Sequence, residues 1–372
     1  MKNAGNKGGE ADFIMFATIM LLLSIGIIMI YSASAWTAGI RYGDDMFFLK
    51  KQLTWAALGI IIMIIVMGID YHKLKRFTTL AMIITIPLLL LVFVFPEING
   101  AKRWIQLGPS SIQPSEIAKY VVVAYLAKSM DYKGEKIKSF LYGVMPYLLI
   151  AGFYAGLVLM ENNLSICSVI MIVTIIVLFV AGARAWHIFG VITPAGLLAG
   201  TVLIFSADYR KKRLLSFLNP WKDAAGDGYQ LIQSLLALGS GGIWGLGLGQ
   251  SRQKCYYMPE PHNDFIFAII GEELGLIGCV FLIMLFVLFV WRGIRTAINA
   301  KDTYGTLLAT GITSIIAVQA IINIAVVTGS MPVTGVPLPF ISYGGSSLVI
   351  NLAAMGVLLN ISRQSKSNKI KI

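Results

Sequence analysis

The chain has 372 residues, of which 57% are hydrophobic and only 13% are charged, and its mean hydropathy is +0.78. Soluble domains are about half apolar and a quarter charged, so this composition excludes an ordinary soluble protein as well as a disordered or fibrous chain. The net charge of +12 could suit nucleic acid, but the basic residues lie between apolar runs, where they set topology and contact lipid phosphate. We therefore expect one integral membrane domain over residues 1–372 and no nucleic-acid partner.

Uncharged runs of about 20 residues predict the membrane spans. In chain order they are 13–40, 52–69, 77–96, 139–160, 162–184, 185–207, 274–291 and the long stretch 303–362, which glycines and prolines between 329 and 339 divide into two helices. The first run is too long for the core of a signal peptide, so we expect an uncleaved helix. A weaker candidate, 114–128, contains Glu116 and Lys119. Together these segments predict an all-α fold with ten transmembrane helices, and neither strand alternation nor an internal repeat is visible.

The basic residues predict the orientation of the helices. With the N-terminus inside, seventeen basic residues fall in inner segments and five in short outer segments, so the positive-inside rule predicts that both termini are cytoplasmic. The long outer loop between the seventh and eighth helices, residues 208–262, is left out of this comparison because long loops cross regardless of charge. Within it, 229–251 is uncharged but rich in glycine, so we expect a short interfacial helix over 229–238 followed by a loop packed on protein.

Ionisable and polar side chains inside the spans are candidates for a functional site. Glu116 and Lys119 are three residues apart on one helical face and can pair, either as a structural ion pair or as a contact to substrate. Gln319, Asn323 and Asn351 lie in the last two helices, where interhelical hydrogen bonding is the favoured role.

The long outer loop carries an excess of positive charge, with seven basic and four acidic residues. The basic residues are Arg210, Lys211, Lys212, Arg213, Lys222, Arg252 and Lys254. A positive pocket on this side suits an anionic lipid head group such as a pyrophosphate, and the alternative is ordinary lipid anchoring.

An acidic residue follows this loop. Pro259 and Pro261 favour an extended approach to the bilayer, which places Asp264 at the start of the eighth helix. Capping of that helix alone could explain Asp264. Glu272 and Glu273 lie deeper, and burying two adjacent acids has no evident structural reason.

The segment 334–347 holds prolines and glycines that exclude a helix, so we expect a re-entrant wall around an outward-facing cleft. Zinc, nucleotide and nucleophile-elbow motifs are missing from the sequence, and the three cysteines are far apart, which predicts neither a disulfide framework nor soluble-cofactor chemistry.

At these motifs the chain resembles the SEDS family (shape, elongation, division and sporulation), which contains FtsW, RodA and SpoVE. The matching stretches are 102–105 (KRWI), 113–116 (QPSE) with Lys119, 228–234 (GYQLIQS), 245–254, 259–275 and 334–347. The stretches 247–254 (GLGQSRQK) and 259–261 (PEP) resemble the FtsW and SpoVE branch more than RodA. Two departures are Asn263, where the family commonly has threonine, and the pair Asn162 and Asn163, where it has Pro-Asp or Pro-Asn.

The resemblance implies ten membrane helices in the bacterial cytoplasmic membrane and peptidoglycan glycosyltransferase activity on lipid II. It also implies a class B penicillin-binding protein, a transpeptidase, as partner within the division or sporulation cell-wall machinery. The essential aspartate of the family corresponds to Asp264, its outer tryptophan to Trp104 and its fourth-helix lysine to Lys119. The further residues that we expect to contact substrate are Arg103, Glu116, Gln233, Ser234, Gln250, Arg252, Lys254, Glu260, His262, Glu272, Ser342, Tyr343 and Ser346.

The expected chemistry is a processive, inverting glycosyl transfer. A sugar hydroxyl is a weak nucleophile, so Asp264 would take its proton as general base. The leaving pyrophosphate requires basic groups or a divalent cation, Mg²⁺ or Mn²⁺, to stabilise its charge. Two alternatives remain open at this stage, a flippase for lipid II and a non-catalytic scaffold for the transpeptidase.

Overall fold

The computed structural model describes residues 9–97, 100–108, 110–206 and 208–365. Within these ranges eight helical segments are long and apolar enough to cross a membrane, so the chain is a polytopic membrane protein. These segments contain α1 (Phe13–Tyr42), α2 (Phe47–Gly68), α3 (Tyr71–Leu91) with η1 (Val92–Val94), α5 (Met145–Met160) preceded by η3 (Phe140–Val144), α7 (Thr193–Phe205) preceded by η4 (His187–Ile192), α11 (Ile266–Ile298), α12 (Thr303–Val327) and α13 (Gly345–Gln364).

Two further helices belong to the same bundle. The weaker candidate span is α4 (Pro114–Lys133), a continuous helix that packs on α3, α6 and α12 and is followed by η2 (Gly134–Lys138). The apolar helix α6 (Leu164–Val180) has 17 residues and packs on α4, α5 and α12. The all-α class is confirmed, and the number of ten spans stays a prediction.

The ends of three helices meet at one end of the bundle. The backbone N–H of Asp12, just before α1, donates to Ser362 Oγ of α13 at 3.1 Å. Arg292 Nε of α11 donates to Asp12 Oδ2 at 2.8 Å. The start of α1 and the end of α13 therefore lie on the same side, as an even number of crossings requires.

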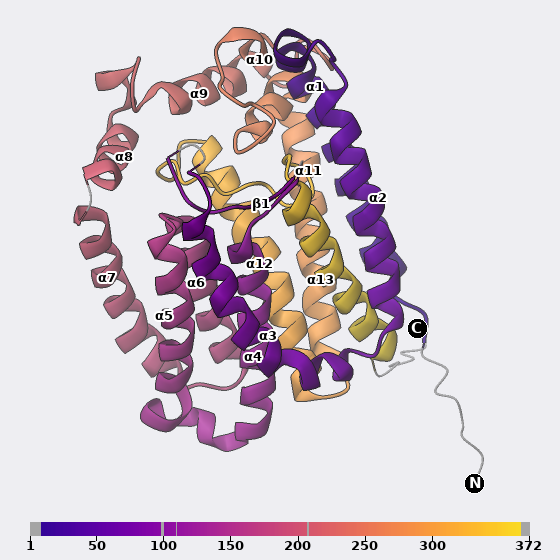
Figure 1. The fold of residues 1–372 in the computed structure, drawn as a ribbon, viewed down its shortest axis with the longest axis vertical. Helices are drawn as coiled ribbons and strands as arrows, with labels where there is room; N and C mark the ends of the chain where they lie inside the picture. The colour runs from indigo at the N-terminus through magenta and orange to yellow at the C-terminus, as the bar shows by residue number, and fades with distance from the viewer. Residues whose placement is uncertain (1–8, 98–99, 109, 207, 366–372) are drawn as a thin grey trace.

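The opposite end carries the loops and short helices (Figure 1). Residues 208–262 form α8 (Asp208–Leu218), η5 (Pro220–Asp223), α9 (Tyr229–Gly241) and α10 (Gln253–Tyr256). The predicted short helix over 229–238 is confirmed as α9, which is three residues longer. One short hairpin accompanies the helices, in which β1 (Ile105–Leu107) pairs antiparallel with β2 (Ser110–Ile112). Strands of three residues are too short for alternation to reveal them.

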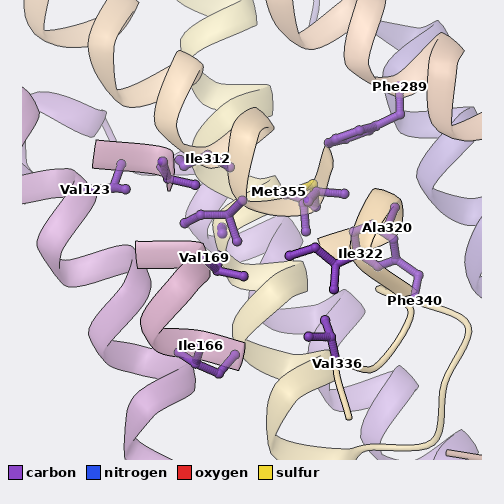
Figure 2. Packing of buried hydrophobic residues seen from close by; sticks show 14 of the residues in the cluster. Val123, Ile166, Val169, Phe289, Ile312, Ala320, Ile322, Val336, Phe340 and Met355 are labelled. Atoms are coloured by element: carbon purple, nitrogen blue, oxygen red, sulfur yellow. The ribbon is translucent and has the colours of Figure 1, made fainter. Parts of the chain in front are cut away.

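The core joins helices that are distant in the sequence. Figure 2 shows Val123 of α4, Val169 of α6 and Ile312 of α12 in one cluster with Met355 of α13. The non-helical segment 334–344 penetrates this core, and Phe340 within it is 2% exposed. Irregular backbone at this depth is buried in protein, as the re-entrant prediction requires.

One glycine of α1 permits this burial. A Cβ added at Gly26 would lie 2.3 Å from the carbonyl oxygen of Phe340, whereas a Cβ at Gly39 of the same helix would contact nothing within 4 Å. Replacing Gly26→Ala should lower the free energy of unfolding in detergent by about 1–3 kcal/mol, because backbone must move to relieve the clash. Thermal unfolding, monitored by size-exclusion chromatography, measures the effect. Gly39→Ala is the matched control and should leave the transition unchanged or raise it.

Candidate functional site

Asp264 lies at the loop-bearing end of the bundle, two residues before α11. Asn323 Nδ2 of α12 donates to the backbone oxygen of Asp264 at 2.8 Å and to that of Val336 at 2.7 Å. The neighbouring segment is held in the same way, since Ser342 Oγ donates to the oxygen of Asn263 at 2.8 Å. These bonds fix the backbone of Asp264 and use none of its carboxylate oxygens.

The capping role considered for Asp264 is wrong. The N-cap of α11 is Phe265, and no side chain caps this helix. The carboxylate of the half-buried Asp264 instead lies against Gly335, where an added Cβ would be 3.2 Å from Oδ2. Gly335 has a φ of 74°, a left-handed conformation that favours glycine. The non-helical segment 334–344, here called the wall segment, can therefore approach the carboxylate of Asp264 closely.

The electrostatic surroundings of Asp264 suit a base. Burial, together with the charge of Glu260, raises the pKa of Asp264 to about 6, while Arg103 and Arg213 oppose this rise. The carboxylate is therefore ionised at neutral pH and holds a proton more readily than an exposed aspartate does.

A cavity of about 760 Å³ is lined by residues 331–334, which lead into the wall segment, and Asp264 is not among its lining residues. Thr334, the neighbour of Gly335, lines it, and Arg103, Arg210 and Arg213 contribute positive charge. The remaining wall is mostly apolar and includes Ile172, Ile204, Leu214, Val318, Ile321 and Ile322. The cavity thus combines guanidinium groups with an apolar chamber, which suits a ligand that has an anionic head and a hydrocarbon tail.

Arg103 is positioned by the turn between α5 and α6. Its Nη2 donates to the backbone oxygen of Asn162 at 2.6 Å and its Nε to that of Glu161 at 3.3 Å. Asn162 has a φ of 59°, and the side chain of Asn163 caps α6 by accepting from Ile166 N at 3.2 Å. Asn162 and Asn163 therefore build a turn in which backbone carbonyls hold the guanidinium of Arg103.

Glu161 in this turn is an acid that sequence reasoning did not single out. It is 1% exposed, and burial raises the pKa of Glu161 to about 8, against the opposing effects of Ser115 and Arg103. The only signal in the sequence was an acid at the end of an apolar run.

Glu116 and Lys119 form the predicted ion pair, which is fully buried. Lys119 Nζ lies 2.7 Å from Glu116 Oε2 and donates to Gln319 Oε1 at 2.9 Å, and Ser347 Oγ donates to Glu116 Oε2 at 2.7 Å. The group connects α4, α12 and α13. Tyr120 OH also donates to Asn351 Oδ1 at 2.8 Å, so the interhelical bonding predicted for Gln319 and Asn351 is confirmed, whereas Asn323 bonds to backbone outside the helices.

A second buried group involves the acids of α11. Lys254 Nζ pairs with Glu273 Oε1 at 2.7 Å, and the backbone N–H of Arg252 donates to Glu272 Oε1 at 2.9 Å. Ser251 also donates to Glu272. These bonds supply the missing structural reason for two adjacent buried acids. They also place Lys254 and Glu272 outside the lining of the large cavity, so substrate contacts by Arg252, Lys254 and Glu272 stay predictions.

The other predicted residues lie on several different elements. His262 packs its ring 4.3 Å from Phe48 and 5.5 Å from Tyr343, and burial, with Arg41 nearby, lowers the pKa of His262 to about 4. Ser234 is buried and donates to Val327 O at 2.7 Å. The rest are the exposed Gln250 and Glu260 and the partly buried Trp104, Gln233 and Ser346.

The family model described as "Cell cycle protein", covering FtsW, RodA and SpoVE, matches residues 12–367, and the chain belongs to this family. It is 49% identical to stage V sporulation protein E of Bacillus subtilis over 97% of this chain and 99% of that one. It is 42% identical to the probable peptidoglycan glycosyltransferase FtsW of Geobacter sp. (strain M18), over 95% of this chain and 97% of that one.

Solved structures agree with this assignment. A chain from a peptidoglycan synthase complex, described as coordinating polymerization and crosslinking, superposes with a TM-score of 0.78 at 28% identity, over 95% of this chain and 98% of that one. The rod shape determining protein RodA of Thermus thermophilus superposes with a TM-score of 0.73 at 26% identity, over 96% of this chain and 98% of that one. The RodA-like fold is therefore shared along the whole chain.

The buried ion pair yields a stability prediction. Lys119→Met should lower the free energy of unfolding by about 3–5 kcal/mol, because it leaves Glu116 charged and buried without its partner. The double variant Glu116→Gln with Lys119→Met should recover most of this loss. Thermal unfolding in detergent compares the three proteins, and equal losses in the single and double variants would contradict the prediction.

Proposed function

We propose that this protein is a peptidoglycan glycosyltransferase that polymerises lipid II at the outer leaflet of the bacterial cytoplasmic membrane. The observation that carries the proposal is the ionisable carboxylate of Asp264 at Gly335, next to residues 331–334, which line a cavity that combines three arginines with mostly apolar walls. The relatives named as probable peptidoglycan glycosyltransferase FtsW support it.

The proposed topology has ten spans with both termini in the cytoplasm. The α4 and α6 helices supply the two spans beyond the eight that satisfy length and hydropathy. The end of the bundle that holds Asp12 and Ser362 is taken as cytoplasmic, because basic residues such as Lys75, Arg76 and Arg292 occur there. Asp264 then faces the outer side, where glycan strands are built.

In the proposed reaction, the 4-hydroxyl of the acceptor's terminal sugar attacks the anomeric carbon of the donor. A carbon–oxygen bond forms as the bond from that carbon to the pyrophosphate breaks, which inverts the configuration. Asp264 takes the hydroxyl proton, and its pKa of about 6 keeps it ionised at neutral pH while it remains basic enough to accept. The hydrogen bonds of Asn323 and Ser342 hold the acid's backbone in place.

The undecaprenyl pyrophosphate leaving group matches the cavity. Arg103, Arg210 and Arg213 would stabilise the negative charge that accumulates on the pyrophosphate. The apolar wall would take the first part of the isoprenoid chain. Among the described residues no cluster of three or more His, Cys, Asp or Glu could hold a metal ion by itself. If a divalent cation, Mg²⁺ or Mn²⁺, takes part, the carboxylates of Asp264 and Glu260 would hold it, and it would help to stabilise the negative charge of the pyrophosphate.

The proposed partner is a class B penicillin-binding protein that crosslinks the glycan strands. The structural similarity to a chain of a complex described as coordinating polymerization and crosslinking supports this partner. One relative is named for sporulation and another is named FtsW, and they align with 97% and 95% of this chain. Cell division and spore formation are therefore both proposed settings.

Removal of the base tests the proposal directly. Asp264→Asn should reduce polymer formation from purified lipid II by at least about 100-fold, since general-base catalysis is worth that much, while the thermal transition stays in place. The matched control is Asp227→Asn, which changes an exposed loop acid. The assay in detergent also separates the alternatives, because a flippase or a scaffold makes no polymer there. Normal glycan chains from Asp264→Asn would refute the assignment.

The pH dependence follows from the raised pKa of Asp264. A base must be deprotonated, so the rate should fall as pH drops below about 6. Glu260→Gln removes a negative charge that raises this pKa, so the acidic limb should move to lower pH in that variant. Initial rates of lipid II polymerisation between pH 4.5 and 8 measure both curves, and an unchanged limb in Glu260→Gln would contradict the coupling.

The role of the arginines can be measured by binding alone. Arg213→Gln should weaken binding of undecaprenyl pyrophosphate by roughly 10- to 100-fold, because a hydrogen bond to a charged group contributes about 1.5–3 kcal/mol. Lys211→Gln, on the same helix but outside the cavity lining, is the control and should bind normally. Native mass spectrometry gives both affinities.

A further inference from the structure

The long helix α11 is broken near its outer end. Gly275 has a φ of 67°, so the helix before it, 266–274, and the helix after it do not share one hydrogen-bond pattern. A segment of residues 242–249, here called the glycine loop, supplies the missing partners. Leu246 N donates to Glu272 O at 2.9 Å and Gly247 N to Glu273 O at 3.0 Å. In return, Leu276 N donates to Gly242 O at 2.9 Å and Ile277 N to Ile243 O at 3.3 Å.

The glycine loop and α11 approach each other too closely for a side chain at Gly245 or Gly275. A Cβ at Gly275 would lie 2.4 Å from Gly245 N, and a Cβ at Gly245 would lie 2.2 Å from Glu273 O. The inner side of the loop is also fixed, because the ion pair of Lys254 with Glu273 ties the residues that follow it to α11. The glycine loop is therefore a rigid part of this helix end.

The outer side of the glycine loop is apolar and exposed. Ile243, Trp244, Leu246 and Leu248 are 59%, 81%, 40% and 57% exposed, and the whole stretch 229–251 carries no charge. Directly beyond the break, α11 exposes Leu276, Ile277, Val280 and Phe281. Ile243 is hydrogen-bonded to Ile277, so the two exposed sets form one continuous apolar surface.

That surface belongs to a helix that crosses the membrane. Residues 266–273 of α11 are all buried, and exposure of α11 begins only after the break. The α9 helix and the glycine loop together cover this end of α11. The peptide groups of the loop that are bonded to α11 tolerate an apolar medium, whereas unpaired peptide groups would not. Tryptophan is the residue that favours the boundary between lipid and water.

We propose that the glycine loop is inserted into the outer leaflet and that Ile243, Trp244, Leu246 and Leu248 contact lipid acyl chains. The occupant is lipid because this surface continues the lipid-facing side of α11 without a polar gap. The insertion fixes how deep the segment that leads to Asp264 lies relative to the outer leaflet. It does not depend on the glycosyltransferase activity.

Spin labels test the insertion on the full chain in vesicles of phosphatidylcholine and phosphatidylglycerol. The background is Cys255→Ser, since Cys167 and Cys279 are buried. Labels are attached at Trp244→Cys and, as a second position, at Leu248→Cys. Phe281→Cys provides the lipid-exposed control, and Asp45→Cys, in the exposed loop between α1 and α2, provides the aqueous control.

Collision with oxygen and with a water-soluble nickel chelate is then measured. At 244 and 248 the ratio of the collision rate with oxygen to the collision rate with the nickel chelate should match the ratio at 281. It should exceed the ratio at 45 by roughly tenfold, because a polar reagent is excluded from an apolar phase. A ratio at 244 and 248 equal to that at 45 would overturn the proposal. So would protection from nickel that arises only when the partner transpeptidase is added, since the surface would then be a protein interface.

Discussion

One side chain, Asn323, connects the proposed chemistry to the core. Its amide donates to the backbone of Asp264 on one side and of Val336 on the other, at 2.8 and 2.7 Å. In an apolar interior such bonds are costly to break, so the acid and the wall segment are held together as one unit. The wall segment is itself confined by α1, where Gly26 lets the Phe340 backbone approach. The position of a single carboxylate therefore depends on helices from both ends of the chain.

Much of this architecture follows from the sequence by simple physics. Uncharged runs located the long helices, and glycines and prolines between 329 and 339 marked the break between α12 and α13. The cost of burying polar groups led to the pairing of Glu116 with Lys119 and to interhelical bonds of Gln319 and Asn351. These inferences work because the membrane leaves few ways to satisfy a polar group.

Other features could not be read from the chain because they depend on tertiary contacts. The two acids Glu272 and Glu273 looked unjustified until the segment 251–254 was found to supply their partners. Glycines in 242–249 suggested a loop, but the sequence does not show that Gly245 faces the break at Gly275, where a Cβ on Gly245 would lie 2.2 Å from Glu273 O. Arg210 and Arg213 had an equal claim to lipid anchoring, and the cavity shows where their charge is directed. Spacing along a sequence carries no information on such long-range pairings.

The left-handed backbone at Asn162 limits which residues can stand at this corner. Proline holds φ near −65°, so a proline at position 162 could not form the same turn. Such a corner would displace the carbonyls that orient Arg103, although neither α5 nor α6 contains the changed residue. The direction of one guanidinium thus depends on a residue that tolerates a positive φ.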